Sequence, residues 1–502
     1  MMKYNMIKLR LKWVWLVVFL AGISLFSYAQ ITLTIEQALD IAEENNPQMI
    51  QAKLSLERTQ FLLEASHAAL KPQFSMTVNP FGYSQNRRFD SYNSAWYTSK
   101  ELTSSGTFQA ELPLLLTDGT LRLSNTFGWQ DSESTRASGT TISKAFSNDL
   151  QLRFIQPLFT YNTTKMEMQR LEFDHENAGI SYALQRLRTE QNITRQFYSV
   201  YLAKSSLEIS HSELENAQTN YDIIKAKVDA QLSAEEELYQ AEVNLMNAES
   251  SVQSDEVSLK NAKDDLKQTL GMPLSEEIDV SVTIEAIPML IDEEKAINFG
   301  LTSRMEIRQR EISMIEADLT MITTKARDAF SGNLSLSIGI TGDNERFGNI
   351  YETPTNSPRV AISFNIPIFD WGQRRARINA QKTAQTIAKL NYDNEVVNIE
   401  LDIRQSVRRL EYLRTQIRIS EITVRNAQQT YTLNQIRYRE GDRTGLEMSQ
   451  YQAQLSSAQT SFVRAQINYK NELLNLKILT LYDFENDKPI IPVKELRDIT
   501  IR

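Results

Sequence analysis

Apolar residues recur every seven positions along three long stretches of the chain. The positions are Leu238, Leu245, Val252, Leu259 and Leu266; Ile403, Leu410, Ile417, Val424, Tyr431 and Tyr438; and Met448, Leu455, Phe462, Tyr469 and Leu476. A strict seven-residue repeat predicts long helices packed side by side in a left-handed coil. A helix from Trp371 to Tyr438 would be about 100 Å long. That length exceeds a globular core and indicates a rod or one stave of a tube.

Shorter segments alternate between apolar and polar residues, which predicts strands with one apolar face. They are residues 73–79, 107–114, 120–129 and 149–157 in the first half, and 333–341 and 359–368 in the second. Thr117-Asp118-Gly119 joins the segments 107–114 and 120–129 as the turn of an extra hairpin, about 103–130. Strands of this kind are typical of a membrane β-barrel, although a half-buried soluble sheet alternates identically. A basic and apolar export signal at the N-terminus, together with the lack of a long apolar helix after it, favours the membrane barrel.

The number of strands implies an oligomer. Two core strands in each half give four per chain, whereas a closed membrane barrel needs about eight or more. Three chains would supply twelve core strands. Whether the extra hairpin widens this barrel or lies outside it stays open here. Aromatic residues near the predicted loops would suit the interfacial girdles of a membrane barrel: they are Tyr83, Tyr92, Trp96, Tyr97, Trp129 and Tyr351.

The chain contains two versions of one plan. Three pairs of segments match: 33–53 with 290–311 at an offset of 258, 152–173 with 362–383 at 210, and 235–251 with 447–462 near 212. In the second pair, Pro157 matches Pro367 where each strand becomes a helix, and proline ends strand pairing there. The offset falls from 258 in the first pair to 210 in the second, so the first half has roughly 48 extra residues between 53 and 152. We assign these extra residues to the hairpin.

The predicted domains follow from these repeats. A signal peptide (1–29) precedes a first repeat (30–290) and a second repeat (291–482), and a tail (483–502) follows. The first repeat holds a helix, strands within 72–159, a long helix 162–228, a helix 233–270 and an equatorial segment. The second holds a helix, strands within 333–369, a long helix 371–440 and a helix 444–482.

The N-terminus predicts export. MMKYNMIKLRLK is basic, an apolar run of about 14 residues follows, and small residues precede a cleavage site that we place after Ala29. A membrane anchor is the alternative, but the run is short for a spanning helix. No later run approaches the roughly 20 apolar residues of such a helix. A chain that crosses a membrane must then do so with strands.

Composition narrows the function further. The net charge of −9 argues against nucleic-acid binding. The chain has no cysteine, and its three histidines are scattered, which disfavours a zinc site or a histidine-dependent hydrolase. We find no nucleotide loop, metal-ligand spacing or nucleophile motif. The sequence therefore predicts a protein that is not an enzyme and has no cofactor or metal.

The segment RYREGDRTGLEMSQ (437–450) interrupts the helical pattern of the second half. Gly441 is a natural left-handed helix stop. Thr444 followed by Glu447 predicts a capping box that opens the next helix, and Ser233 with Glu236 repeats the spacing in the first half. The break is therefore predicted to be a hairpin tip between two coiled-coil helices, and in a tube of such hairpins the tips define the aperture.

With these residues in hand, the sequence resembles the TolC family of outer-membrane efflux channels. The duplicated N-terminal segments, the junctions IQPLF and IPIFDWGQRRARI, and YREGDRTGLEMSQYQAQ carry the resemblance, which covers essentially the whole mature chain. The family implies an α+β membrane protein: a trimer with a periplasmic α-helical barrel and a 12-stranded transmembrane β-barrel. It also implies the outer membrane of a Gram-negative bacterium, a periplasmic adaptor and an inner-membrane pump. Drug efflux, metal efflux and type I secretion stay open, because the pump selects the substrate.

The resemblance also implies roles for individual residues. Tyr438 and Arg443 would bond to the neighbouring hairpin, where Glu235 stands at the family's acidic position, and hold the periplasmic gate shut. Glu447 and Gln450 would line the pore constriction. Gly441, Asp442 and Asp229 would form the tips that contact the adaptor.

Simpler interpretations exist for these gate and pore residues. Tyr438 continues the heptad seam, Glu447 is part of a capping box, Arg443 could be solvated, and Glu235 belongs to an ordinary acidic helix start. For the whole chain, the alternative is a soluble periplasmic coiled-coil scaffold or adaptor. That alternative explains the heptads but neither the amphipathic strands nor the duplicated proline junctions.

Overall fold

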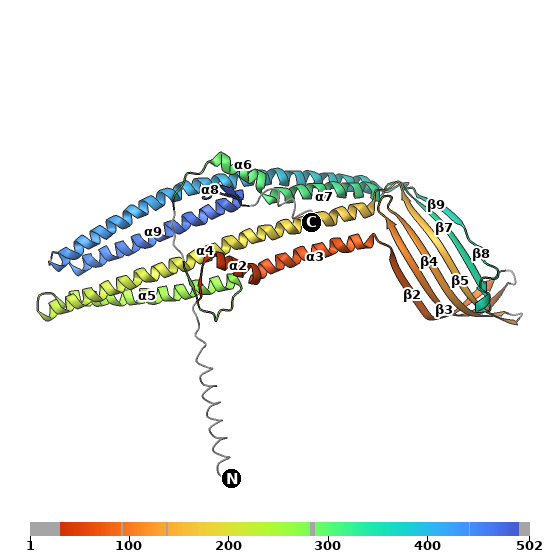
Figure 1. Ribbon diagram of the computed structural model, residues 1–502, viewed down its shortest axis with the longest axis horizontal. Coiled ribbons are helices and arrows are strands. Elements are labelled where there is room, and N and C mark those ends of the chain that lie inside the picture. The colour runs from red at the N-terminus through yellow and green to blue at the C-terminus, as the bar shows by residue number, and fades with distance from the viewer. Residues whose placement is uncertain (1–30, 92–93, 137–138, 282–286, 441, 491–502) are drawn as a thin grey trace, which may run out of the picture. The chain divides into compact units, whose positions relative to one another are not determined.

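The computed structural model describes residues 31–91, 94–136, 139–281, 287–440 and 442–490 (Figure 1). The predicted signal peptide and the end of the tail, residues 491–502, lie outside them. The described chain forms two compact units. One comprises the described parts of 1–54, 181–305 and 396–502, and the other comprises those of 55–180 and 306–395.

Each α-helix described in the first half of the chain has a counterpart of equal length in the second half, which gives four matching pairs. The pairs are α2 (Ile35–Asn45) with α6 (Glu293–Ser303), α3 (Pro47–Ala69) with α7 (Met305–Arg327), α4 (Thr163–Asp229) with α8 (Gln373–Arg439), and α5 (Glu235–Leu270) with α9 (Gly445–Thr480). Their lengths are 11, 23, 67 and 36 residues. A 67-residue helix is about 100 Å long, as the heptad spacing indicated.

Helix starts show where the two halves differ in length. The first two pairs begin 258 residues apart and the last two begin 210 apart, so the difference of 48 residues falls between α3 and α4. The offset near 212 that the sequence match gave for α5 and α9 is wrong by two residues. As a result, Glu237 rather than Glu235 occupies the position that corresponds to Glu447. The domain boundaries that we drew from the repeats stay a prediction.

The strands between the helices form one antiparallel sheet (Figure 1). Its order is β2-β3-β4-β5-β7, and β7 pairs on its other side with β9 and with the short strand β8. The bounds are β2 (Gln73–Asp90), β3 (Ala95–Leu114), β4 (Gly119–Arg136), β5 (Gly139–Leu158), β7 (Ser331–Asn344), β8 (Thr355–Asn356) and β9 (Arg359–Asn365). A single 3₁₀ turn, η1 (Phe347–Asn349), follows β7.

The extra hairpin lies inside this sheet rather than beside it. Its strands β3 and β4 separate β2 from β5, with continuous pairing on both sides. Strands β2 to β5 have 18 to 20 residues each and are longer than the sequence pattern predicted. Strand β9 is shorter and ends at Asn365 instead of residue 368. The described part of the chain therefore has six substantial strands in this sheet.

The two faces of the sheet differ in polarity. Directly paired residues share a face, and one face carries large apolar side chains that are each at least 40% exposed: Phe74, Met76, Val78, Phe108, Leu123, Leu150, Leu152, Ile338 and Ile340. The opposite face carries mainly Ser, Thr, Gln and charged residues. An exposed apolar patch of this breadth is typical of a surface that meets another apolar medium or a partner.

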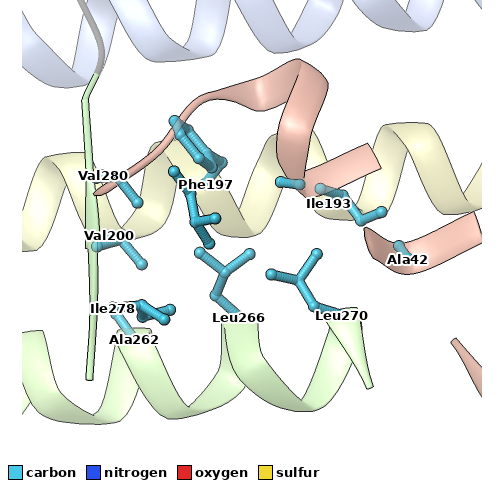
Figure 2. Close-up of a cluster of buried hydrophobic side chains, with 11 residues drawn as sticks. Ala42, Ile193, Phe197, Val200, Ala262, Leu266, Leu270, Ile278 and Val280 are labelled. Atoms are coloured by element: carbon cyan, nitrogen blue, oxygen red, sulfur yellow. The ribbon is translucent and has the colours of Figure 1, made fainter. Parts of the chain in front are cut away.

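Two short strands and parts of three helices form a buried core in the other unit (Figure 2). Strand β1 (Ile31–Leu33) pairs in parallel with β6 (Ile278–Val280), and both pack on α2, α4 and α5. Phe197 and Leu266 at the centre are fully buried. Asn46 donates from Nδ2 to the Thr269 carbonyl at 2.7 Å, and its Oδ1 accepts from the N–H groups of Gln48 and Met49. One side chain thus stabilises the start of α3 and the end of α5.

The chain after α9 turns back as a short hairpin, β10 (Tyr482–Asp483) with β11 (Lys488–Pro489). Lys295 stacks its ammonium on the Tyr482 ring at 4.8 Å and contacts Asp487 at 2.7 Å, which ties this hairpin to α6. Throughout the described ranges, the helices lack the combination of length and apolar character that a membrane crossing requires.

Candidate functional site

The tip of the second hairpin has the predicted cap. Thr444 is the N-cap of α9, and its hydroxyl accepts from the Glu447 N–H at 3.3 Å, while the Glu447 carboxylate accepts from the Thr444 N–H at 2.9 Å. This reciprocal pair confirms the capping box. Asp442 donates its N–H to the Arg437 carbonyl at 2.9 Å and so closes the end of α8. Gly441 lies outside the described residues.

The first hairpin begins its second helix differently. The N-cap of α5 is Ala234, which has no side chain able to cap, so the capping box predicted from Ser233 and Glu236 is wrong. The Ser233 hydroxyl instead contacts the carboxylate of Glu237. The box fails because the helix starts one residue later than the Ser-x-x-Glu spacing requires, which makes Ala234 the N-cap. Asp229, predicted at this tip, is the last residue of α4.

The predicted gate residues occupy the tips but are not all joined within one chain. Arg443 Nη1 contacts Glu447 Oε1 at 2.9 Å, within its own hairpin. Glu235 accepts from the Tyr239 hydroxyl at 3.5 Å. Tyr438 is buried, and the Lys227 ammonium lies 4.9 Å from the centre of its ring. In the part of the chain that the structure describes, no bond joins Tyr438 or Arg443 to Glu235.

Electrostatics point to a different acidic neighbour for Tyr438. Burial raises the pKa of the Tyr438 phenol, and the negative charge of Glu237 raises it further. A protonated phenol that lies near a carboxylate is a potential hydrogen-bond donor to it. The prediction named Glu235, the residue at the acidic position that the family resemblance implied, and so missed Glu237.

The residues predicted to line the constriction lie on the first turns of α9. The pKa of Glu447 is lowered, first by the hydrogen bond from the Thr444 N–H and also by Arg443, so Glu447 carries its charge at neutral pH. Gln450 is exposed. Both side chains are positioned at the tip, and their role in a constriction stays a prediction.

A seam between the two hairpins lies directly behind these tips. It contains the buried apolar residues Ala427, Tyr431, Tyr438, Met448, Leu455 and Ala458, against which Ile223 of α4 packs. Asn216 Nδ2 donates to Gln452 Oε1 at 3.2 Å, which links α4 to α9. A cavity of about 90 Å³ remains there, lined by residues that include Asn220, Tyr438 and Gln452.

Several polar groups in this region are buried without a partner. Among the described residues, the Tyr438 hydroxyl, Asn220 Oδ1, Asn434 Oδ1 and Arg443 Nε accept or donate no hydrogen bond. An unpaired buried polar group costs about 1–3 kcal/mol. Packing across the seam is also tight at Gly445, where a Cβ atom would lie 2.9 Å from Ile224 Cδ1. The seam therefore combines close contact with poorly satisfied polar groups.

The junctions between strands and helices form a second feature. Pro157 lies in the last residues of β5 and is still opposite Asn333 of β7, so the prediction that proline ends strand pairing is wrong there. Pro367 lies two residues beyond β9. The turn of the extra hairpin reaches the start of α4: both Asp118 oxygens accept from backbone N–H groups, those of Thr163 and Thr164, at 3.0 Å each. Both threonine hydroxyls add bonds of 2.7 Å. In the second half, Asp370 serves α8 locally by accepting from Gly372 and Arg374.

The sequence of this chain is similar to those of several known proteins. Residues 323–480 match the family model described as "Outer membrane efflux protein". Nodulation protein T of Rhizobium leguminosarum bv. trifolii is 22% identical over 70% of this chain and 74% of its own length. The cation efflux system protein CusC of Escherichia coli O157:H7 is 20% identical over 70% of this chain and 73% of its own length.

Solved structures share the fold over most of the chain. The CmeC outer membrane channel of Campylobacter jejuni superposes with a TM-score of 0.68 at 15% identity and covers 93% of this chain and 89% of its own. The open state of the MtrE outer membrane channel of Neisseria gonorrhoeae gives a TM-score of 0.65 at 16% identity, with 89% and 88% covered.

Together these comparisons define a TolC-like fold and confirm the resemblance to outer membrane efflux proteins. The comparisons agree with the predicted function, an outer-membrane efflux channel, and with the predicted location in the outer membrane. Both solved structures are described as outer membrane channels.

Proposed function

We propose that three copies of this chain form a channel that carries substrates from an inner-membrane pump and a periplasmic adaptor to the outside of the cell, in efflux or type I secretion. The channel opens and closes at the hairpin tips around Tyr438, Arg443 and Glu447. In this proposal the apolar face of each sheet meets lipid and the polar face lines the pore.

The unsatisfied seam between the two hairpins is the observation that best supports a movable gate. Four buried polar atoms without partners at about 1–3 kcal/mol each make the arrangement costly. A rearrangement that pairs them would recover part of that cost. A switch needs two states that differ by only a few kcal/mol, and the seam provides a free-energy difference of that order.

Contacts between copies would complete the closed state. Arg443 already holds Glu447 at 2.9 Å, and its Nε is free for a second acceptor in the described chain. The Tyr438 hydroxyl is likewise unpaired but buried, and Glu237 of the same chain raises its pKa, so a bond to a neighbouring copy would require the seam to rearrange. An exposed ion pair contributes only about 0–1 kcal/mol. Three symmetric copies of several such bonds would still bias the tips toward closure by a few kcal/mol.

A closed sheet made by three copies would contain the twelve core strands predicted and, in addition, two strands from each extra hairpin. The antiparallel order of the sheet allows this, because β3 and β4 enter as an up-and-down pair between β2 and β5. The proposed assembly therefore has a wider exit than twelve strands would enclose.

The gate is tested by removing its polar groups. We expect the double variant Tyr438→Phe, Arg443→Ser to raise single-channel conductance in planar bilayers, because the substitutions remove the Arg443–Glu447 ion pair and the two donors proposed to bond between copies, and keep the buried ring. The matched control is Arg425→Ser on α8, the helix that contains Tyr438; the exposed ion pair of Arg425 with Glu421 lies away from the tip. Unchanged conductance in the double variant would refute the gate assignment and leave the channel intact.

A further inference from the structure

One cross-strand row on the polar face of the sheet is rich in arginine. Direct pairing from strand to strand places one residue of each of the six strands in this row: Gln73, Glu111, Arg122, Arg153, Ser337 and Arg359. Because directly paired residues point to the same side of a sheet, all three guanidinium groups are on the polar face.

Only part of this positive charge is neutralised. Arg122 pairs with Glu111 through Nη2 at 2.8 Å and Nε at 3.1 Å. Arg153 donates to the neutral Gln151 at 2.8 Å, and Arg359 is exposed. Among the described residues, neither Arg153 nor Arg359 forms an ion pair. Three guanidinium groups and one carboxylate leave a net charge of +2 in the row of each chain.

The arrangement has a cost that a purely structural sheet would avoid. Arg122 and Arg153 are directly opposite each other on β4 and β5, and like charges in that position are destabilising. The neighbouring row on the same face has no charge: Ser75, Gln109, Ser124, Gln151 and Gly339. Uncharged side chains are therefore compatible with this face.

Acidic residues on the same face are too distant to cancel the row. Asp149 is four residues from Arg153 along β5, which is about 13 Å at the rise of an extended strand. That separation exceeds the screening length of about 8 Å at physiological ionic strength. Glu101 of β3 and Asp343 of β7 lie farther along the same face. The polar face thus has a distinct positive band.

We propose that this arginine row, made by Arg122, Arg153 and Arg359, is an anion-attracting band that selects permeating solutes bearing carboxylate or phosphate groups. The proposal rests on the proposed function, because the row meets solutes only if the polar face lines a pore. Guanidinium groups bind such oxyanions in a bidentate manner, and a charged surface inside a low-dielectric wall concentrates counter-ions. The substrate preference would then differ from that of CusC, whose name states cation efflux.

The test measures ion selectivity of the purified full-length channel in planar bilayers under a KCl gradient. We expect Arg153→Gln, Arg359→Gln to lower the chloride-to-potassium permeability ratio about threefold or more. We also expect it to weaken current block by inorganic tripolyphosphate added to each side in turn. The matched control is Lys100→Gln, Lys144→Gln, which removes two positive charges from the opposite face of the same sheet, and it should leave both readouts unchanged.

The outcomes separate the two proposals. An unchanged permeability ratio and unchanged block in the Arg153 and Arg359 variant, with conductance intact, would overturn the anion-attracting row. An equal change in permeability ratio and block in the Lys100 and Lys144 control would also overturn it. Positive charge on either face of the sheet would then have the same effect, and the arginine row would have no special role. If the wild-type protein showed no conductance, the proposed channel itself would be refuted. The proposed role of the arginine row, which depends on the channel, would then be refuted too.

Discussion

Asp118→Ala tests how the extra hairpin is joined to the long helix. Asp118 accepts from the first two N–H groups of α4, Asn162 Oδ1 accepts from the Lys165 N–H at 2.7 Å, and the Asn162 carbonyl accepts from Met166. The first four N–H groups of a helix have no partner within the helix. Here the N–H groups of the first three helical residues are satisfied by side chains, two of them by a residue about 45 positions earlier in the chain.

The magnitude follows from these contacts. Hydrogen bonds to a charged group contribute about 1.5–3 kcal/mol each, but Thr163 is exposed and water replaces much of what is lost. Loss of a helix cap costs about 0.5–2 kcal/mol. We therefore expect local destabilisation of about 2 kcal/mol. Since 1.4 kcal/mol corresponds to a factor of ten, exchange of the amides at the start of α4 should accelerate about thirtyfold.

Hydrogen exchange followed by mass spectrometry on the detergent-solubilised channel measures this effect. Peptides at the start of α4 should lose protection in Asp118→Ala. Peptides at the start of α8 should not change, because Asp370 caps that helix locally. Asp118→Asn keeps an acceptor oxygen without the charge and should be intermediate. Protection at the start of α4 equal to that of the wild type would refute the reasoning.

The same contact predicts a pH dependence. Burial alone would raise the pKa of Asp118, but the hydrogen bonds from Thr164 and Thr163 outweigh it and lower the pKa below its ordinary value of 3.8. A carboxyl whose folded pKa is lowered stabilises the fold above its unfolded pKa. The stabilisation is therefore complete at neutral pH and is lost as the pH falls through the lowered value. The wild type and Asp118→Ala should converge in acid.

Two further predictions concern the core of the unit drawn in Figure 2. Phe197→Ala removes a fully buried ring and should cost about 3–5 kcal/mol, seen as a lower thermal midpoint, whereas the exposed control Lys389→Ala should not shift it. Gly271→Ala should also lower the midpoint, because Gly271 has a φ of 74° and a Cβ there would lie 2.2 Å from the Asn45 carbonyl oxygen; Gly106→Ala, with open space around it, is the control. An unaltered midpoint for either core variant would contradict the packing described.

The helices could be predicted from sequence because their signals are local. Heptad spacing marks the seams of α8 and α9, and the Thr444–Glu447 spacing marks the start of α9. The first hairpin shows the limit of such signals. Glu235, Glu236 and Glu237 are the same residue type, so the sequence alone does not show which of them corresponds to Glu447. The structure does, because α5 starts at Glu235 and Glu237 is then its third residue, as Glu447 is in α9.

The lengths of the strands were harder to predict from sequence, because they depend on pairing with neighbouring strands and not on the alternation of apolar and polar residues. Strand β2 continues to Asp90 across Pro80 and Gly82, where its register with β3 shifts, so alternation is lost while pairing persists. The Asp118 cap and the arginine row depend on residues far apart in the chain, and only the register of the sheet brings them together. The segment Thr117-Asp118-Gly119 predicted a turn, but no neighbouring residue indicated that the Asp118 carboxylate would cap the start of α4.

The central claim is that this chain forms a trimeric outer-membrane channel. The most direct measurement extracts the protein from the outer-membrane fraction in mild detergent and determines both the particle mass and the conductance in a lipid bilayer. The account predicts a detergent-dependent trimer with a small conductance, since the tips are closed at rest. A particle that stays in solution without detergent and conducts no current would contradict it and favour a periplasmic coiled-coil scaffold.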